Sequence, residues 1–221
     1  MNDAQSADAA AAGYRYGLVF LLIFGVVVFI IVTPDGRASQ AVSFAIVAAA
    51  LAVVIGTSRE RSEVRRRRVL VAGALAILIT LGIAVGLVSR SVTFVLIALM
   101  TLAIPFSLAR GLLRLIRERG VTTQAVAGAL AIYLLLGLMF YCAIGFVAAV
   151  GPSHYFAQGT NGTASSDLYY SFTVLTTTGF GDFTAAHNAG RALAVIEMLV
   201  GQLYLVTVIG VVIGRRVESA R

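Results

Sequence analysis

Six long apolar runs follow one another along the chain, and polar, arginine-rich or glycine-rich segments separate them. None of the first five runs contains a charged residue, and the sixth contains only Glu197. Each run is close to the roughly 20 residues that a helix needs to cross a bilayer. A buried helix of a soluble protein normally keeps a polar stripe, whereas these runs keep none. The pattern therefore predicts six transmembrane helices. They lie at residues 16–32, 41–56, 69–88, 92–109, 125–150 and 192–214.

Composition agrees with a membrane protein. Hydrophobic residues make up 59% of the 221-residue chain and charged residues only 12%, whereas soluble domains carry about 25% charged residues. The single Cys142 excludes an intramolecular disulfide and a cysteine-based zinc site. The two histidines, His154 and His187, are too far apart in sequence for a usual metal-ligand pair.

The basic residues set the expected orientation. All 17 are arginine, the net charge is +7, and 14 of the 17 fall on one side of a six-span arrangement. Arg37, Arg90 and Arg191 fall on the other side. Because cytoplasmic loops carry the excess of positive charge, both termini are predicted to be cytoplasmic in a plasma-membrane protein. This distribution favours contact with anionic lipid headgroups over nucleic-acid binding.

The segment between the fifth and sixth runs, residues 151–191, breaks the simple pattern. A Gly-Pro turn and a flexible, glycine-containing stretch come first. Residues 165–176 then begin with Ser and Asp, which cap helices, and are long enough for about three helical turns. Such a helix is too short to cross the membrane. We therefore expect a re-entrant segment on the outer side, whose irregular backbone lines a water-filled path.

The six residues after this short helix resemble the filter of potassium channels, whose usual form is Thr-Val-Gly-Tyr-Gly-Asp. Thr178 stands in place of Val, and Phe180 stands in place of Tyr. The resemblance covers residues 125–216 and is weak over the first four runs. It implies a pore-loop channel of the six-helix, single-pore prokaryotic type. The filter residues would be Thr177, Thr178, Gly179, Phe180, Gly181 and Asp182.

Physical chemistry explains why a filter needs such residues. A potassium ion sheds its water, and backbone carbonyls that point at one axis replace that shell. Successive inward carbonyls require alternating backbone conformations, which Gly179 and Gly181 adopt at low steric cost.

The resemblance also implies roles for individual groups. The carbonyls of residues 177–180 would bind K⁺, the Thr177 hydroxyl would complete the innermost site, and Asp182 would lie at the outer mouth. Tyr169 and Tyr170 would pack with Phe180 around the filter, and no other cofactor is implied. One strand cannot surround an ion and the chain contains one such motif, so a homotetramer is expected.

The last run carries candidate gating residues. Gly201 has the spacing from Gly179 of the hinge glycine in many potassium channels, although a small residue that allows close helix packing is an equally good interpretation. Four residues at roughly helical spacing are candidates to line the cavity, with the glutamine as its polar member. They are Gln202, Leu205, Ile209 and Ile213.

Glu197 is the one charged residue within a run, and a carboxyl group in the membrane needs a partner. We expect it to face the back of the short helix, with a hydrogen bond near Tyr170 or Thr173. Thr173 occupies the position where a subset of the family has a supporting carboxylate, so Glu197 takes over that support. A lipid-facing, protonated Glu197 is the alternative.

The first four runs look like an uncharged relative of a voltage-sensor domain. The fourth run has no arginine, although a voltage sensor needs charges that move through the field. Arg110, Arg114 and Arg117 come only at its inner end, in a stretch that reads as an interfacial amphipathic helix. We therefore expect a structural collar without voltage sensing of its own.

The predicted organisation has five parts: a disordered tail at 1–15, a four-helix domain at 16–109, a linker helix at 110–123, a pore domain at 124–216 and a short tail at 217–221. Because so few residues follow the pore domain, no cytoplasmic ligand-binding domain is expected on this chain.

Two other functions are also compatible with the sequence. A weakly selective cation channel would follow if Thr178 and Phe180 alter the filter's support. A cation-transporter subunit with a filter-like loop would usually contain internal repeats, and the chain has one copy of the motif. An enzyme is not expected, because no nucleophile–base pair, metal cluster or phosphate-binding loop is evident.

Overall fold

The regular secondary structure of the described residues consists of helices. This computed structural model covers residues 3–56, 62–89, 91–102, 105, 122–151 and 153–210. Within them, β pairing is limited to isolated bridges from Phe156 to Thr160 and Ala185. The helices are α1 (Asp3–Val32), α2 (Arg37–Gly56), α3 (Ser62–Val85), Ser91–Leu102, α5 (Thr123–Val150), α6 (Ala164–Leu175), α7 (Asn188–Tyr204) and the π-helical turn η1 (Leu205–Ile209).

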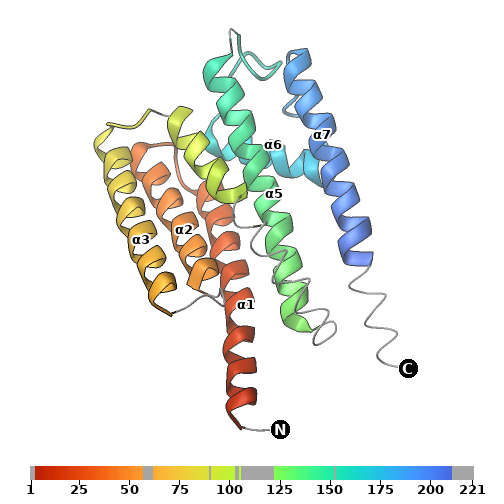
Figure 1. Cartoon of the computed structure of the whole chain (residues 1–221). Coiled ribbons are helices and arrows are strands. Elements are labelled where there is room, and N and C mark those ends of the chain that lie inside the picture. Colours follow the sequence, from red (N-terminus) through yellow and green to blue (C-terminus); the bar gives the residue numbers. More distant parts are fainter. Residues whose placement is uncertain are drawn as a thin grey trace.

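Figure 1 shows α1, α2 and α3 side by side, with α5 running along α1. The short α6 lies between α5 and α7, and it also contacts α1. The amino end of α1 and the carboxyl end of α7 point toward the same end of the molecule. One hydrophobic core joins α1, α2, Ser91–Leu102 and α5, and a second lies around the loops next to α6.

Two of the described helical stretches are long and apolar enough to cross a membrane. They are Thr123–Val150 and Asn188–Val208. The other apolar helices, Tyr16–Val32, Arg37–Val53, Leu70–Val85 and Ser91–Leu102, have 10–17 residues. These two stretches correspond to the fifth and sixth predicted spans. The arrangement with six spans stays a prediction.

Several helix boundaries differ from the sequence-based expectation. α1 begins at Asp3, so most of the predicted disordered tail is helical. α3 begins at Ser62 and therefore contains Arg65 to Arg68, which were expected in a loop. The alanine-rich start of α1 and the arginines of α3 have high helix propensity, which apolar periodicity ignores. The predicted linker helix at 110–123 and the tail at 217–221 lie outside the described residues, apart from Thr122 and Thr123.

Candidate functional site

The short helix α6 begins with a capping box. The Thr163 side chain accepts from the Ser166 backbone N–H, and the Ser166 hydroxyl accepts from the Thr163 N–H. The helix cap is therefore Thr163 and not Ser165 or Asp167, because only the residue just before the helix can offer its side chain to the free N–H groups of the first turn. The predicted boundaries differ by one residue at each end, because the helix covers Ala164–Leu175.

The segment after α6 turns back on the helix end and bonds to it through its N–H groups. The Thr177 N–H donates to the Val174 carbonyl over 2.9 Å. The N–H groups of Thr178 and Gly179 both donate to the Thr173 carbonyl, over 2.9 and 3.1 Å. The backbone donors of this segment thus face α6.

The carbonyls of the same segment have no such partners. Within the described residues, the carbonyls of residues 177–180 accept no hydrogen bond. All of these residues are exposed in the single chain. Since backbone carbonyls normally find a partner, four consecutive free ones form a row of acceptors that is available to a ligand.

Backbone conformation alternates along this row. Gly179 and Gly181 have φ values of +51° and +82°, the left-handed conformation expected of them. Thr177 shares it with a φ of +57°, and it is the one non-glycine residue with positive φ in the described chain. A β-branched residue in this region is strained, and such strain concentrates at functional sites. Sequence reasoning missed Thr177's conformation, because glycine is the usual signal for positive φ.

One tyrosine of α6 packs against an aromatic side chain of the row. Tyr169 stacks on Phe180, with ring centroids 6.2 Å apart and planes 5° apart. Tyr170 instead packs edge-on against Tyr155 and Phe156 in the second core. Of the two tyrosines, Tyr169 is the one that stacks on Phe180 within the single chain, and the packing of both tyrosines around the filter stays a prediction.

The outer end of the segment is tied to the loop before α6. The Gln158 amide donates to the Asp182 carbonyl over 2.8 Å.

Two threonines have roles that differ from their expected ones. Thr173 supports the segment through its backbone carbonyl, while its hydroxyl donates to the Tyr170 carbonyl over 2.8 Å. Thr178, in place of the usual Val, has its hydroxyl 2.9 Å from that of Thr176. The Thr176 hydroxyl in turn donates to the Phe172 carbonyl over 2.7 Å.

Glu197 faces α6, as expected, but its partner is Ser171. The Ser171 hydroxyl lies 2.6 Å from Glu197 Oε1 and 2.9 Å from the Gly137 carbonyl. Both side chains are fully buried. Because Ser171, Glu197 and Gly137 belong to α6, α7 and α5, this contact joins all three helices. A lipid-facing Glu197 is thereby contradicted, and no sequence signal marked Ser171.

We expect Glu197→Ala to lower the stability of the folded protein more than Glu197→Gln. Alanine removes the acceptor for Ser171 and leaves a void, at a cost of about 1–3 kcal/mol, whereas glutamine keeps the size and an acceptor oxygen. Thermal unfolding in detergent measures both. Equal losses in the two variants would contradict the Ser171 contact, and Ser171→Ala in each background shows whether the two side chains act as a pair.

Gly201 lies where α7 crosses the end of α6. A Cβ at this position would come closer to the Leu175 carbonyl oxygen than real Cβ contacts allow. Gly201 is buried and α-helical, and the regular helix continues to Tyr204 before η1 begins. The geometry therefore favours the packing interpretation over a hinge at Gly201. Tyr204 fixes the same region by donating to the Ala129 carbonyl over 2.6 Å.

Of the candidate cavity residues, Gln202 reaches the site directly. Its amide donates to the Thr177 hydroxyl over 3.0 Å. Leu205 starts the π-helical turn and is half-buried, and Ile209 ends that turn. Ile213 lies outside the described residues. π-Helical turns often occur at functional sites, and no pattern in the sequence predicted this one.

Residues 128–217 match the model of a family described as an ion channel. This segment resembles an ion-channel domain. It contains most of α5, all of α6, the row of free carbonyls and α7. No curated protein and no solved structure gives a significant match to the chain.

The match supports passive ion conduction by residues 128–217. Together with the two long apolar helices, it indicates a membrane protein. Ion-channel families are in general not enzymes, which agrees with the expectation from the sequence. Residues 1–127 lie outside the matched segment.

Proposed function

We propose that the chain forms a homotetrameric, potassium-selective channel that lets K⁺ flow passively down its gradient in the plasma membrane, with both termini cytoplasmic. The carbonyls of residues 177–180 bind dehydrated K⁺, and the Thr177 hydroxyl completes the innermost site. Asp182 lies at the outer mouth. The alternation of backbone conformation and the absence of internal partners for these carbonyls carry the proposal.

The exposed apolar surface of α7 supports assembly of the chain with further copies of itself. Only 11% of its apolar window is buried in the single chain, against 56% for α5. Its four buried residues lie at helical spacing on one side of the helix: Gly190, Ala194, Glu197 and Gly201. The opposite face exposes large apolar side chains such as Leu199 and Leu203. A fourfold ring of identical chains covers part of this face and brings four carbonyl rows to one axis.

The short helix α6 adds an electrostatic contribution. Its carboxyl end lies directly before the carbonyl row. Since the carboxyl end of a helix carries a partial negative charge, four such ends at the axis favour a cation over an anion. The lipid bilayer, with anionic lipids at the cytoplasmic arginines, completes the expected partners, and no nucleic acid is among them.

A weakly selective cation channel is the second candidate. Thr178 replaces the usual Val, and its hydroxyl bonds to Thr176 instead of packing as an apolar group. Phe180 has no hydroxyl with which to anchor the segment. A transporter subunit is disfavoured because the chain has a single filter-like motif.

Flux through the purified chain in liposomes tests the proposal. The expected result is a tetramer by mass that releases K⁺ rapidly and Na⁺ much more slowly under matched gradients. Equal flux of both ions would contradict potassium selectivity and support the weakly selective cation channel. A monomer without flux would contradict the channel itself.

We expect Gln202→Leu to reduce the preference for K⁺ over Na⁺. The change removes the side-chain donor to Thr177 while the strained backbone there remains. A lost hydrogen bond of about 1 kcal/mol corresponds to roughly a fivefold change. Gln124→Leu is the matched control, because Gln124 lies at the contact between α5 and α1. Equal selectivity in the two variants would show that the Gln202 amide does not support the filter.

A further inference from the structure

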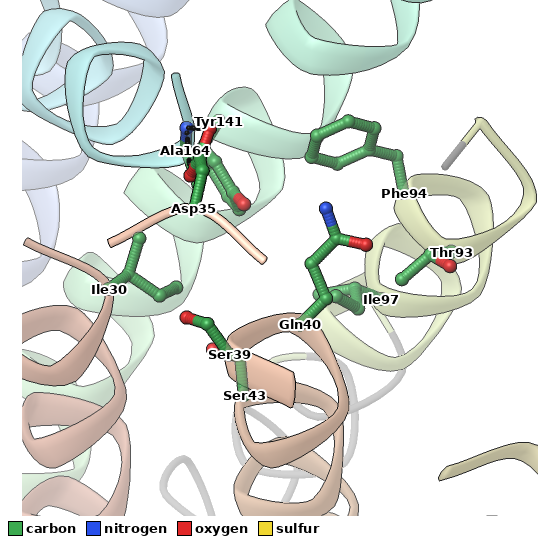
Figure 2. Close-up of a pocket in the computed structure, with 10 residues that line it drawn as sticks. All are labelled: Ile30, Asp35, Ser39, Gln40, Ser43, Thr93, Phe94, Ile97, Tyr141 and Ala164. Atoms are coloured by element: carbon green, nitrogen blue, oxygen red, sulfur yellow. Dashed lines mark hydrogen bonds between the residues drawn. The ribbon is translucent and has the colours of Figure 1, made fainter. Parts of the chain in front are cut away.

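The amino end of α6 contacts the loop that follows α1. The Ala164 N–H donates to both carboxylate oxygens of Asp35, over 2.9 and 3.0 Å. Figure 2 draws the two residues next to each other, at the edge of a cavity of about 10 Å³. The contact joins positions 129 residues apart in the sequence.

A second bond runs in the opposite direction. The Ser165 hydroxyl donates to the Ile31 carbonyl over 3.1 Å. Ile31 belongs to the last turn of α1, where carbonyls lack a partner within the helix. Ala164 belongs to the first turn of α6, where N–H groups lack one. The end of α1 with its following loop and the start of α6 therefore each provide a hydrogen-bond partner for a backbone group of the other.

Asp35 accepts a hydrogen bond from a backbone N–H group that the capping box leaves without a partner. The Thr163 side chain serves the Ser166 N–H, whereas the Ala164 N–H depends on Asp35. A carboxylate at the amino end of a helix also interacts favourably with the helix dipole. Asp35 belongs to the solvent-exposed residues, so this contact does not fully remove its charge from water.

We propose that Asp35 is a positioning residue for the filter, and that the helices outside the matched ion-channel segment act on conduction through this contact. The proposal rests on the channel function proposed above. The mechanical link is short: Asp35 holds one end of the 12-residue α6, and the Thr173 carbonyl near the other end accepts from Thr178 and Gly179. A shift of α6 along its axis displaces the carbonyl row.

Two substitutions remove the contact from opposite sides. Asp35→Ala removes the acceptor, and Asp35→Asn keeps an acceptor oxygen without the charge. Ala164→Pro removes the donor, at the first helical position, where proline is well tolerated. The extended conformation of Thr163 suits a residue before proline. Arg37→Ala is the control, because the Arg37 side chain packs at Gly86 in the same outer region.

K⁺ flux per tetramer in liposomes is the first measurement. We expect Asp35→Ala to lower it roughly 5- to 30-fold, the factor that corresponds to a lost helix cap. Asp35→Asn should retain most of the wild-type flux, and Arg37→Ala should retain all of it. In the Ala164→Pro background, Asp35→Ala should cause no further loss of flux. Equal loss in the Ala and Asn variants, or additive losses in the double variant, would overturn the proposal.

Hydrogen–deuterium exchange separates this proposal from the channel function, because it needs no conduction. We expect Asp35→Ala to speed exchange in α6 and in residues 176–182 of the tetramer. Faster exchange confined to the first turn of α6 would overturn the link to the filter even if the wild-type chain conducts. A wild-type chain without K⁺ flux would overturn the channel function whatever the exchange pattern.

Discussion

The Gly179→Ala variant is expected to lose K⁺ flux almost completely while it still folds. Gly179 has a φ of +51°, where a Cβ costs about 1–2 kcal/mol per residue. Four identical subunits raise this to at least about 4 kcal/mol, which corresponds to a roughly 1000-fold lower population of the conducting backbone. The peptide relaxes instead to negative φ, which turns a carbonyl away from the axis.

The chain offers a matched control for this variant. Gly159 also has positive φ, +76°, and like Gly179 has no atom within 4 Å of an added Cβ. It lies in the exposed loop before α6, outside the carbonyl row. Gly159→Ala should therefore carry a similar local strain and conduct normally. Equal loss of flux in both variants would mean that general destabilisation, and not filter geometry, explains the effect.

The Gly201→Ala variant is expected to lose both thermal stability and flux. An added Cβ would collide with the Leu175 carbonyl, so α7 must move away from the end of α6. Overpacking of this kind typically costs about 1–3 kcal/mol. The same movement separates Gln202 from Thr177, whose side chains are bonded in the native arrangement. Thermal unfolding and liposome flux measure the two effects.

Gly210→Ala separates packing from helix flexibility. Gly210 continues the same helical segment and has no atom within 4 Å of an added Cβ. Alanine there removes the flexibility of glycine without a collision and favours the helix by about 1 kcal/mol. We expect normal stability and flux. If Gly201→Ala instead keeps full thermal stability and changes only the opening of the channel, Gly201 is a hinge.

The sequence predicted the features that depend on short stretches of chain. The apolar run at 125–150 corresponds closely to α5 (Thr123–Val150), and the short helix was placed within one residue of α6. The positive φ of Gly179 and Gly181 also followed from the residues themselves. In each case, local composition, capping and glycine content were sufficient.

Contacts between distant residues could not be predicted in this way. Glu197 needed a buried partner, but only the crossing of α6 and α7 identifies Ser171 rather than Tyr170 or Thr173. The bond from Ala164 to Asp35 depends on how α1 packs beside α6. Thr177 adopts positive φ in a segment held to α6 on one side and to Gln202 on the other. Tertiary packing determines these partners and conformations, and the periodicity of apolar residues carries no information about it.

Direct location of bound ions tests the central claim most sharply. An experimental structure of the purified protein with Rb⁺ or Tl⁺ in place of K⁺ reveals these electron-rich ions by their anomalous scattering. Our account predicts four chains around one axis, with ion peaks on that axis between the carbonyls of residues 177–180. Peaks elsewhere, no peaks at these carbonyls, or an assembly other than a fourfold ring would contradict it.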